Sequence, residues 1–170
     1  MHYLGVDLVE LIRTVGLFGL FFIVFAETGL FLGFFFPGDS LLFVAGLLAA
    51  QGLFPVPLLM LILLVAAITG NMTGYWFGRK VGPKLFERDD SLFFRKAHVR
   101  RAQSFYEKHG AKTIMLARFV PIVRTFGPIV AGIAEMNYRS FMLYNIFGAV
   151  IWTVGLTLGG YLFGNLITDV

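Results

Sequence analysis

The sequence predicts an all-α membrane protein made of two inverted repeats, each a re-entrant hairpin of broken helices followed by a transmembrane helix. Composition is the first reason. The chain is 58% hydrophobic and 14% charged, whereas soluble domains are about 45–50% apolar and about 25% charged. The other reasons are charge-free runs long enough to cross a bilayer and a pattern that recurs in both halves. We expect one domain over residues 1–170, with repeat 1 over about 14–80, a cytoplasmic linker with an amphipathic helix over about 81–112, and repeat 2 over about 113–165.

Two apolar runs without a formal charge are predicted to be transmembrane helices. A spanning helix needs about 20 apolar residues. After Pro55 and Pro57, the first run leaves Leu58–Gly78 as a span of suitable length. The second run, Ser140–Gly164, is the other clear span.

Two further apolar segments contain charges and helix-breaking residues. Residues 14–50 are interrupted by Glu27 and by the sequence Phe36-Pro37-Gly38-Asp39-Ser40. Residues 113–134 are interrupted by Arg118, Pro121, Arg124 and Pro128. Irregular backbone at membrane depth is tolerated only where it is buried in protein or lines a cavity. We therefore predict re-entrant hairpins, and the alternative of ordinary helices joined at the membrane surface stays open, including a full crossing by residues 14–36.

The connection between the repeats holds most of the positive charge. Ten of the 14 Lys and Arg residues lie between Arg79 and Lys112, and the positive-inside rule places such a loop in the cytoplasm. Within it, Ser91–His109 has an apolar stripe at helical spacing among basic residues, with Gly110 as its C-cap. This pattern predicts a helix in the membrane interface. Nucleic-acid binding would also use basic residues, but it would leave the apolar bulk of the chain unexplained.

An internal repeat relates the two halves at an offset of 86 residues. Val44-Ala45-Gly46 matches Val130-Ala131-Gly132, and the sequence Gly-Tyr-x-Phe-Gly occurs at both 74–78 and 160–164. Each repeat contains one clear transmembrane helix. Because an odd number of crossings per repeat reverses the orientation of the second copy, the repeats are inverted, which is an architecture found in transporters. Gly70, Gly74 and Gly78 share one helix face, and small residues allow close helix packing. We expect this face to meet the helix that carries Gly160 and Gly164.

Four ionisable residues lie inside the broken segments: Glu27, Asp39, Arg118 and Arg124. Insertion scales assign roughly 2.5–3.5 kcal/mol to a charged residue at the bilayer centre. If the repeats face each other, two carboxylates meet two guanidinium groups and the set is neutral. One interpretation is a pair of structural ion pairs that hold the hairpins together. The other is an anion site, because arginine forks match phosphate geometry and carboxylates would compete for them.

We favour the anion site, since an apolar pair would hold the hairpins at lower cost. It makes Arg118 and Arg124 substrate-binding residues, and Glu27 and Asp39 proton-coupling residues. A structural role is expected for prolines and glycines at the breaks and packing faces: Pro37, Gly38, Pro121, Gly74, Gly78, Gly160 and Gly164. We expect no catalytic residue, metal or cofactor, and no enzyme activity, because the chain has no cysteine and no hydrolase cluster or phosphate loop.

Three motifs stand out: Glu27-x-Gly29 with Gly33-x-Phe35-x-Pro37-Gly38-Asp39-Ser40, then Arg118-Phe119-x-Pro121-x-x-Arg124-Thr125 with Ala131-Gly132, and Gly70-Asn71-x-x-Gly74-Tyr75-x-x-Gly78-Arg79. Together they resemble the motifs of the DedA family, also called the VTT or SNARE-associated membrane domain. The last of the three matches except at Asn71, where the family usually has aspartate. The resemblance covers roughly residues 15 to 165.

The resemblance implies a bacterial inner-membrane transporter with two opposed re-entrant hairpins. Bacterial members are implicated in recycling undecaprenyl phosphate, the lipid carrier of cell-wall synthesis, and in proton-dependent tolerance of alkaline pH and drugs. Eukaryotic relatives scramble phospholipids. The functional acids of the family correspond to Glu27 and Asp39, and its functional arginines to Arg118 and Arg124.

We therefore expect a flippase that moves an anionic lipid carrier such as undecaprenyl phosphate and is coupled to protons. Two alternatives stay open: a proton-coupled exporter of small solutes or drugs in the same fold, and a membrane scaffold with structural ion pairs. The expected partners are membrane lipids and protons, and not nucleic acid. The identity of the lipid, the coupling ion and the formation of a homo-oligomer are left open.

Overall fold

The computed structural model describes residues 2–3, 6–29, 38–87, 104, 108 and 112–168, and these residues are almost entirely helical. Two two-residue strands, β1 (His2–Tyr3) and β2 (Val6–Asp7), pair in antiparallel fashion at the start of the chain. The predicted all-α class is confirmed. The helices are α1 (Leu8–Gly29), α2 (Gly38–Ala50), α3 (Val56–Glu87), α5 (Lys112–Ala117), α6 (Pro121–Ile133) and α7 (Tyr138–Thr168).

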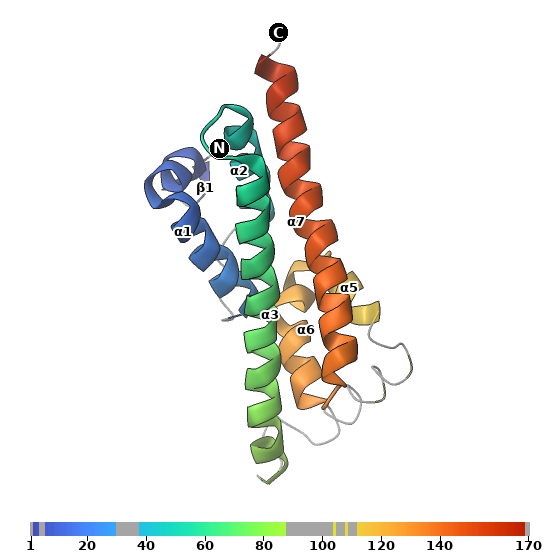
Figure 1. The fold of residues 1–170 in the computed structure, drawn as a ribbon. Helices are drawn as coiled ribbons and strands as arrows, with labels where there is room; N and C mark the ends of the chain where they lie inside the picture. Colours follow the sequence, from blue (N-terminus) through green and yellow to red (C-terminus); the bar gives the residue numbers. More distant parts are fainter. Residues whose placement is uncertain are drawn as a thin grey trace.

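Two long helices, α3 and α7, run side by side in opposite directions along the length of the molecule (Figure 1). They contain the predicted spans at 58–78 and 140–164 and extend beyond both ends of each. In the described part of the chain, three helical stretches are long and apolar enough to cross a membrane: Val9–Gly29, Val56–Gly82 and Tyr138–Ile167. The prediction of a membrane protein is therefore confirmed.

The shorter helices lie at opposite ends of this long pair. In Figure 1, α1 and α2 lie beside the half of the molecule that contains the C-terminus, and α5 and α6 lie beside the other half. Gly16 interrupts α1 with a left-handed backbone (φ 59°, ψ −162°). The regular helix after Gly16, like the 13-residue helices α2 and α6, is therefore about 20 Å long at 1.5 Å per residue. A bilayer core is about 30 Å thick.

Glycines fit α2 closely against α7. A Cβ atom on Gly46 would overlap the backbone oxygen of Thr157, and a Cβ on Gly160 would overlap the backbone of Phe43. A Cβ on Gly164 would lie 2.7 Å from the Ala50 Cβ. The two backbones approach within a distance that only glycine permits, so these residues determine the crossing.

The contact between α6 and α3 repeats this arrangement. A Cβ on Gly132 would overlap the backbone oxygen of Tyr75, and a Cβ on Gly78 would overlap the backbone oxygen of Ile129. Gly46 and Gly132 are equivalent at the 86-residue offset found in the sequence. Thus α2 packs against α7, and α6 packs against α3.

The expected partner of the α3 glycine face was wrong. Gly78 contacts α6, and Gly70 contacts the end of α1, where its Cα lies close to the position that a Cβ on Gly29 would occupy. The helix that carries Gly160 packs its glycines on α2 instead. The physical reason is that α2 and α6 have small residues of their own, so each long helix meets a complementary short helix.

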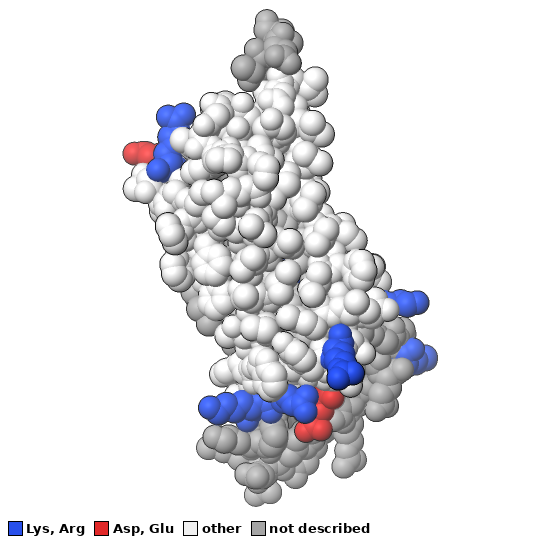
Figure 2. Space-filling model, in the orientation of Figure 1, with Lys and Arg blue, Asp and Glu red and all other residues white. Residues whose placement is uncertain are grey.

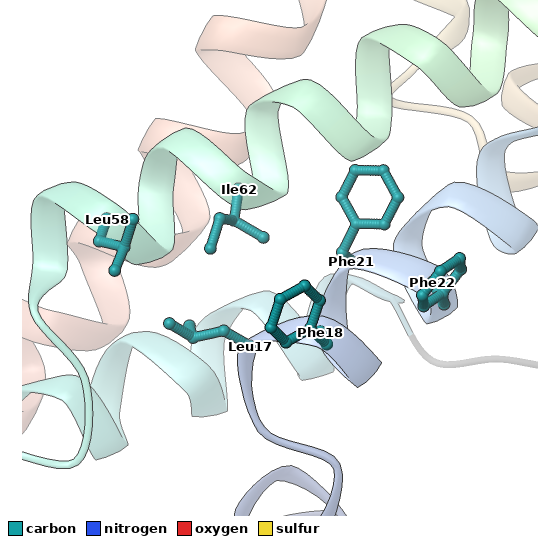
Figure 3. A pocket seen from close by; sticks show the side chains of 6 residues that line it. All are labelled: Leu17, Phe18, Phe21, Phe22, Leu58 and Ile62. Carbon is teal, nitrogen blue, oxygen red and sulfur yellow. The ribbon is translucent and has the colours of Figure 1, made fainter.

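The surface matches a protein immersed in lipid. Figure 2 shows charged side chains gathered towards two ends, separated by a broad uncharged band. Large apolar side chains are exposed on both long helices, including Leu61, Trp76, Phe147 and Leu162. An apolar groove of about 480 Å³ between α1 and α3 is lined by Leu17, Phe18, Phe21, Phe22, Leu58 and Ile62 (Figure 3). None of these six side chains is polar, so the groove can contact only hydrocarbon groups.

Some predictions fall on residues outside the described ranges. Pro37 is one of them. The predicted interfacial helix Ser91–His109 and its cap Gly110 are others, apart from Ser104 and Lys108, which are both helical and exposed.

Candidate functional site

Arg124 on α6 binds both acids, Glu27 at the end of α1 and Asp39 at the start of α2. Its Nη2 donates to Glu27 Oε1 at 2.5 Å, and its Nη1 donates to Asp39 Oδ1 at 2.7 Å. The Glu27 side chain is fully buried, whereas 54% of the Asp39 side chain is accessible. One guanidinium therefore holds a buried and an accessible carboxylate at once.

Helix ends determine where the two acids lie. Glu27 is in the last turn of α1, which ends at Gly29 against the backbone of α3. Asp39 is in the first turn of α2, where the helix dipole favours a negative charge. Gly38 has no side chain, and this leaves room for the Glu27 carboxylate directly beside its Cα.

Arg124 reaches these acids because α6 begins three residues earlier. Pro121 occupies the first turn of α6, where its missing N–H costs no hydrogen bond and its fixed φ suits a helix. The turn at 118–120 separates α6 from α5. Arg118 lies in this turn and Arg124 in α6, so the two side chains follow different backbone directions.

Arg118 binds neither acid. Its Nη2 donates to Asn145 Oδ1 at 2.6 Å and to the carbonyl oxygen of Ala67 at 3.4 Å. The residue is 2% exposed, and its Nε and Nη1 have no hydrogen-bond partner among the residues that the structure describes. The structure therefore brings Glu27, Asp39 and Arg124 together and leaves Arg118 with neutral partners, in place of two separate ion pairs.

Two asparagines, which the sequence did not single out as site residues, form the surroundings of Arg118. Asn145 on α7 donates to the carbonyl oxygen of Ile68, and Asn71 on α3 donates to Asn145 Oδ1 at 3.0 Å. With its amide turned over, Asn71 accepts from Arg118 Nη2 at 2.9 Å and donates to the carbonyl oxygen of Thr28 at 3.2 Å. Buried amides in apolar helices are the signal that could have revealed them, because each must satisfy its hydrogen bonds.

Trp152 on α7 contacts both arginines and one acid. Its ring centroid lies 4.7 Å from Arg124 Cζ and 5.9 Å from Arg118 Cζ, within the range of cation–π attraction. Its Nε1 donates to Asp39 Oδ1 at 2.8 Å. The indole thus links the ion-paired arginine to the arginine without an acid.

A cavity of about 250 Å³ opens beside these groups. Its walls contain Asp39, Arg118, Phe119, Ile151, Trp152, Gly155 and Leu156. An accessible carboxylate and a guanidinium therefore share a mostly apolar chamber. Such a chamber can receive the anionic group of an amphipathic molecule through charge-assisted hydrogen bonds.

The fold and this charge cluster define a helical membrane protein, and comparisons with known proteins identify its class. The sequence matches the VTT domain over residues 36–162. Protein DedA of Escherichia coli K12 is 47% identical over 169 residues, which cover 96% of this chain and 77% of that protein. An uncharacterized membrane protein of Mycobacterium tuberculosis H37Rv is 45% identical over 168 residues, covering 98% of this chain and 73% of that protein.

A further relative is inner membrane protein YqjA of Escherichia coli K12. It is 35% identical over 148 residues, which cover 87% of this chain and 67% of that protein. No solved structure matches the chain significantly. The chain belongs to the DedA family of membrane proteins.

Proposed function

We propose that this protein is a transporter that moves an anionic lipid carrier, such as undecaprenyl phosphate, across the bacterial inner membrane. One observation carries the proposal: a buried guanidinium, Arg118, lines a cavity and has two nitrogens without a hydrogen-bond partner in the described part of the chain. Arginine is suited to bidentate recognition of phosphate. The apolar walls of the cavity and the apolar exterior let a lipid tail stay in hydrocarbon while its headgroup enters.

The proposal includes two re-entrant hairpins of opposite orientation, α1–α2 and α5–α6. The helices after Gly16 in α1 and in α2 and α6 are shorter than the bilayer core. The equivalent packing of Gly46 and Gly132 against opposite long helices supports an inverted repeat. In this arrangement the charges lie where the hairpins meet, and the linker at 79–112 faces the cytoplasm.

Proton coupling would act through the carboxylates that bind Arg124. Ionised Asp39 and Glu27 accept from Nη1 and Nη2 of Arg124, respectively. Protonation of a carboxylate weakens its bond to Arg124, and the guanidinium becomes available to the phosphate. Loss of the proton in the other transport state restores the ion pairs and displaces the phosphate.

Two other functions predict different behaviour. An exporter of small solutes would use the same charges without requiring a lipid tail. A scaffold would need the ion pairs for stability alone. The accessible Asp39 and the unpartnered Arg118 nitrogens favour transport over the scaffold. A buried ion pair stabilises a protein only when all its hydrogen-bonding groups have partners, and a purely structural cluster should meet that condition.

The test is reconstitution into proteoliposomes with a short-chain polyprenyl phosphate, with and without a proton gradient. We expect translocation of the phosphate that the gradient alters, and no acceleration for the matching alcohol. Equal acceleration of the phosphate and the alcohol would contradict an anion-selective transporter. No acceleration of either would favour the scaffold.

A further inference from the structure

A polar cavity of about 460 Å³ lies near the end of α3 and the start of α7. Its walls contain Arg79, Glu135, Asn137, Tyr138 and Arg139, and none of these residues lines the cavity beside Arg118. Figure 2 shows positive and negative side chains together at this end of the molecule. The cavity is therefore a second polar site, separate from the charge cluster between the helices.

Aromatic side chains place this cavity at the level of lipid headgroups. Trp76 is 50% exposed on α3, one turn before Arg79, and its ring centroid lies 5.4 Å from that of Tyr138. Tryptophan and tyrosine are enriched at the interface between membrane and water. Further along α7, Leu143 and Phe147 are exposed apolar side chains that suit hydrocarbon. The cavity thus lies at the border between the apolar exterior and the charged end of the molecule.

A buried tyrosine holds Arg79 at the edge of the cavity. Arg79 Nη1 donates to the hydroxyl of Tyr75 at 3.0 Å, and this hydroxyl donates to the carbonyl oxygen of Met136 at 2.5 Å. Tyr75 is fully buried, whereas Arg79 is exposed. Because the guanidinium is already held in place, binding a ligand costs less side-chain entropy than it would for a mobile arginine.

Arg139 supplies a second guanidinium from the first turn of α7. Asn137 caps this helix, since its Oδ1 accepts from the backbone N–H groups of Arg139 at 3.0 Å and Ser140 at 3.3 Å. The cap occupies N–H groups that could otherwise bind an anion. Recognition therefore depends on the side chains of Arg79 and Arg139, whose planar forks suit phosphate oxygens.

Glu135 lines the cavity in a backbone conformation that favours glycine. Its φ is 54°, and it follows the end of α6, where its N–H bonds to the carbonyl oxygen of Gly132 and the N–H of Met136 bonds to that of Ala131. This position is usually glycine, because a side chain makes the left-handed conformation unfavourable. Within the described residues, Glu135 has no ion pair with either arginine of the cavity. Strained residues cluster at ligand sites, so the carboxylate itself has a role in the cavity.

We infer that this cavity binds the phosphodiester headgroup of an anionic glycerophospholipid, such as phosphatidylglycerol, in the leaflet on the side of the basic linker. Two guanidinium groups and one carboxylate leave the cavity with one net positive charge. A phosphodiester carries one negative charge, whereas a phosphomonoester carries about 1.5–2 at pH 7. Arg79 and Arg139 bind the phosphate, and Glu135 limits the site to a headgroup with one negative charge. This inference goes beyond the proposed transport function and does not depend on it.

The experiment measures lipid protection of the delipidated full chain in detergent. The probes are the dioctanoyl forms of phosphatidylglycerol, phosphatidic acid and phosphatidylcholine, and the soluble headgroup glycerophosphoglycerol. The readout is the shift in melting temperature with ligand concentration. We expect the largest shift with phosphatidylglycerol and none with the soluble headgroup at the same concentration. Equal shifts with phosphatidylcholine, with phosphatidic acid or with the soluble headgroup would overturn the inference.

Arg79→Gln and Arg139→Gln test the guanidinium groups. We expect each to weaken binding of phosphatidylglycerol roughly tenfold, because a charge-assisted hydrogen bond is lost. Arg13→Gln is the matched control, since Arg13 is an exposed arginine of α1 outside the cavity. It should bind within a few-fold of the wild type. Equal weakening in all three variants would overturn the inference, and if Arg79→Gln does not fold, Arg139→Gln decides.

Two variants of Glu135 test the limit on charge. Glu135→Gln should raise the affinity for phosphatidic acid relative to phosphatidylglycerol several-fold, because the repelling carboxylate is gone. Glu135→Gly removes the same carboxylate and also relieves the left-handed backbone, so it should show the same change in preference and melt at a higher temperature than the wild type without lipid. An unchanged lipid preference in both variants would overturn the inference.

Discussion

Gly38 lies directly against the carboxylate of Glu27, so close that a Cβ atom on Gly38 would overlap both carboxylate oxygens. This contact places the buried acid of α1 beside the first turn of α2, within reach of Arg124. The geometry of the ion cluster therefore depends on a residue without a side chain.

Gly38→Ala should lower the stability of the protein and disturb the Arg124–Glu27 bond. Overpacking typically costs about 1–3 kcal/mol, and we expect a loss in this range from thermal unfolding in detergent. Shortening the acid removes the clash, so Gly38→Ala combined with Glu27→Ala should lose less than the sum of the two single variants. Strict additivity of the two losses would show that the glycine and the carboxylate do not compete for space.

The glycine contacts between short and long helices give a second prediction. Gly132→Ala should destabilise the protein by about 1–3 kcal/mol, because its Cβ would overlap the α3 backbone. Gly155→Ala on α7 is the matched control, since no atom lies within 4 Å of its added Cβ. The control should melt at or above the wild-type temperature because alanine favours helix over glycine by about 1 kcal/mol. Equal melting temperatures for the two variants would show that α6 does not depend on this close approach.

In the proposed mechanism, protonation of the acids releases Arg124, so the acids should control the pH dependence of transport. Glu27→Gln and Asp39→Asn keep side-chain size but cannot ionise. We expect each to bind a lipid phosphate and to lose part or all of the pH dependence of that binding, measured as ligand protection at two pH values. Wild-type pH dependence in both variants would exclude these carboxylates as the coupling groups.

Topology can be tested at the two ends of the molecule. The inverted arrangement predicts that the basic linker is cytoplasmic and that the end of α7 lies on the opposite side. Single cysteines at Ser104 and Asn165 can be labelled with an impermeant reagent in oriented vesicles, because the chain has no native cysteine. Labelling of both positions from one side would be incompatible with an odd number of crossings between them.

The long helices could be predicted because their signal is local. Charge-free runs of suitable length, together with Pro55 and Pro57 at the start of α3, determine a span within a few residues. The broken segments were also evident from Pro37, Gly38 and Pro121, which interrupt apolar sequence. The partners of the glycine faces could not be read in the same way. A stripe of small residues shows that a helix packs closely, but whether α3 meets α6 or α7 with this face depends on how the shorter helices are placed against the long pair.

For the site, too, the sequence indicates which residues are unusual, but only the structure shows which of them contact each other. Each of Glu27, Asp39, Arg118 and Arg124 is conspicuous because a charge in apolar sequence is costly. Which acid meets which arginine depends on how the helices pack together, and in the structure both acids bind Arg124. Asn71 and Asn145 are neutral and so less conspicuous than the charges, and their contact with Arg118 becomes evident only when the helices are placed together.

In the proposed mechanism, Arg118 receives the phosphate of a lipid during transport. The most direct measurement compares translocation of a short-chain polyprenyl phosphate in proteoliposomes by the wild type, by Arg118→Gln and by Arg13→Gln. Arg13 is an exposed arginine in α1 and is the matched control. We predict that Arg118→Gln reduces the initial rate roughly tenfold or more, whereas Arg13→Gln stays close to the wild type. A wild-type rate in Arg118→Gln, at equal reconstituted amounts of folded protein, would contradict the account.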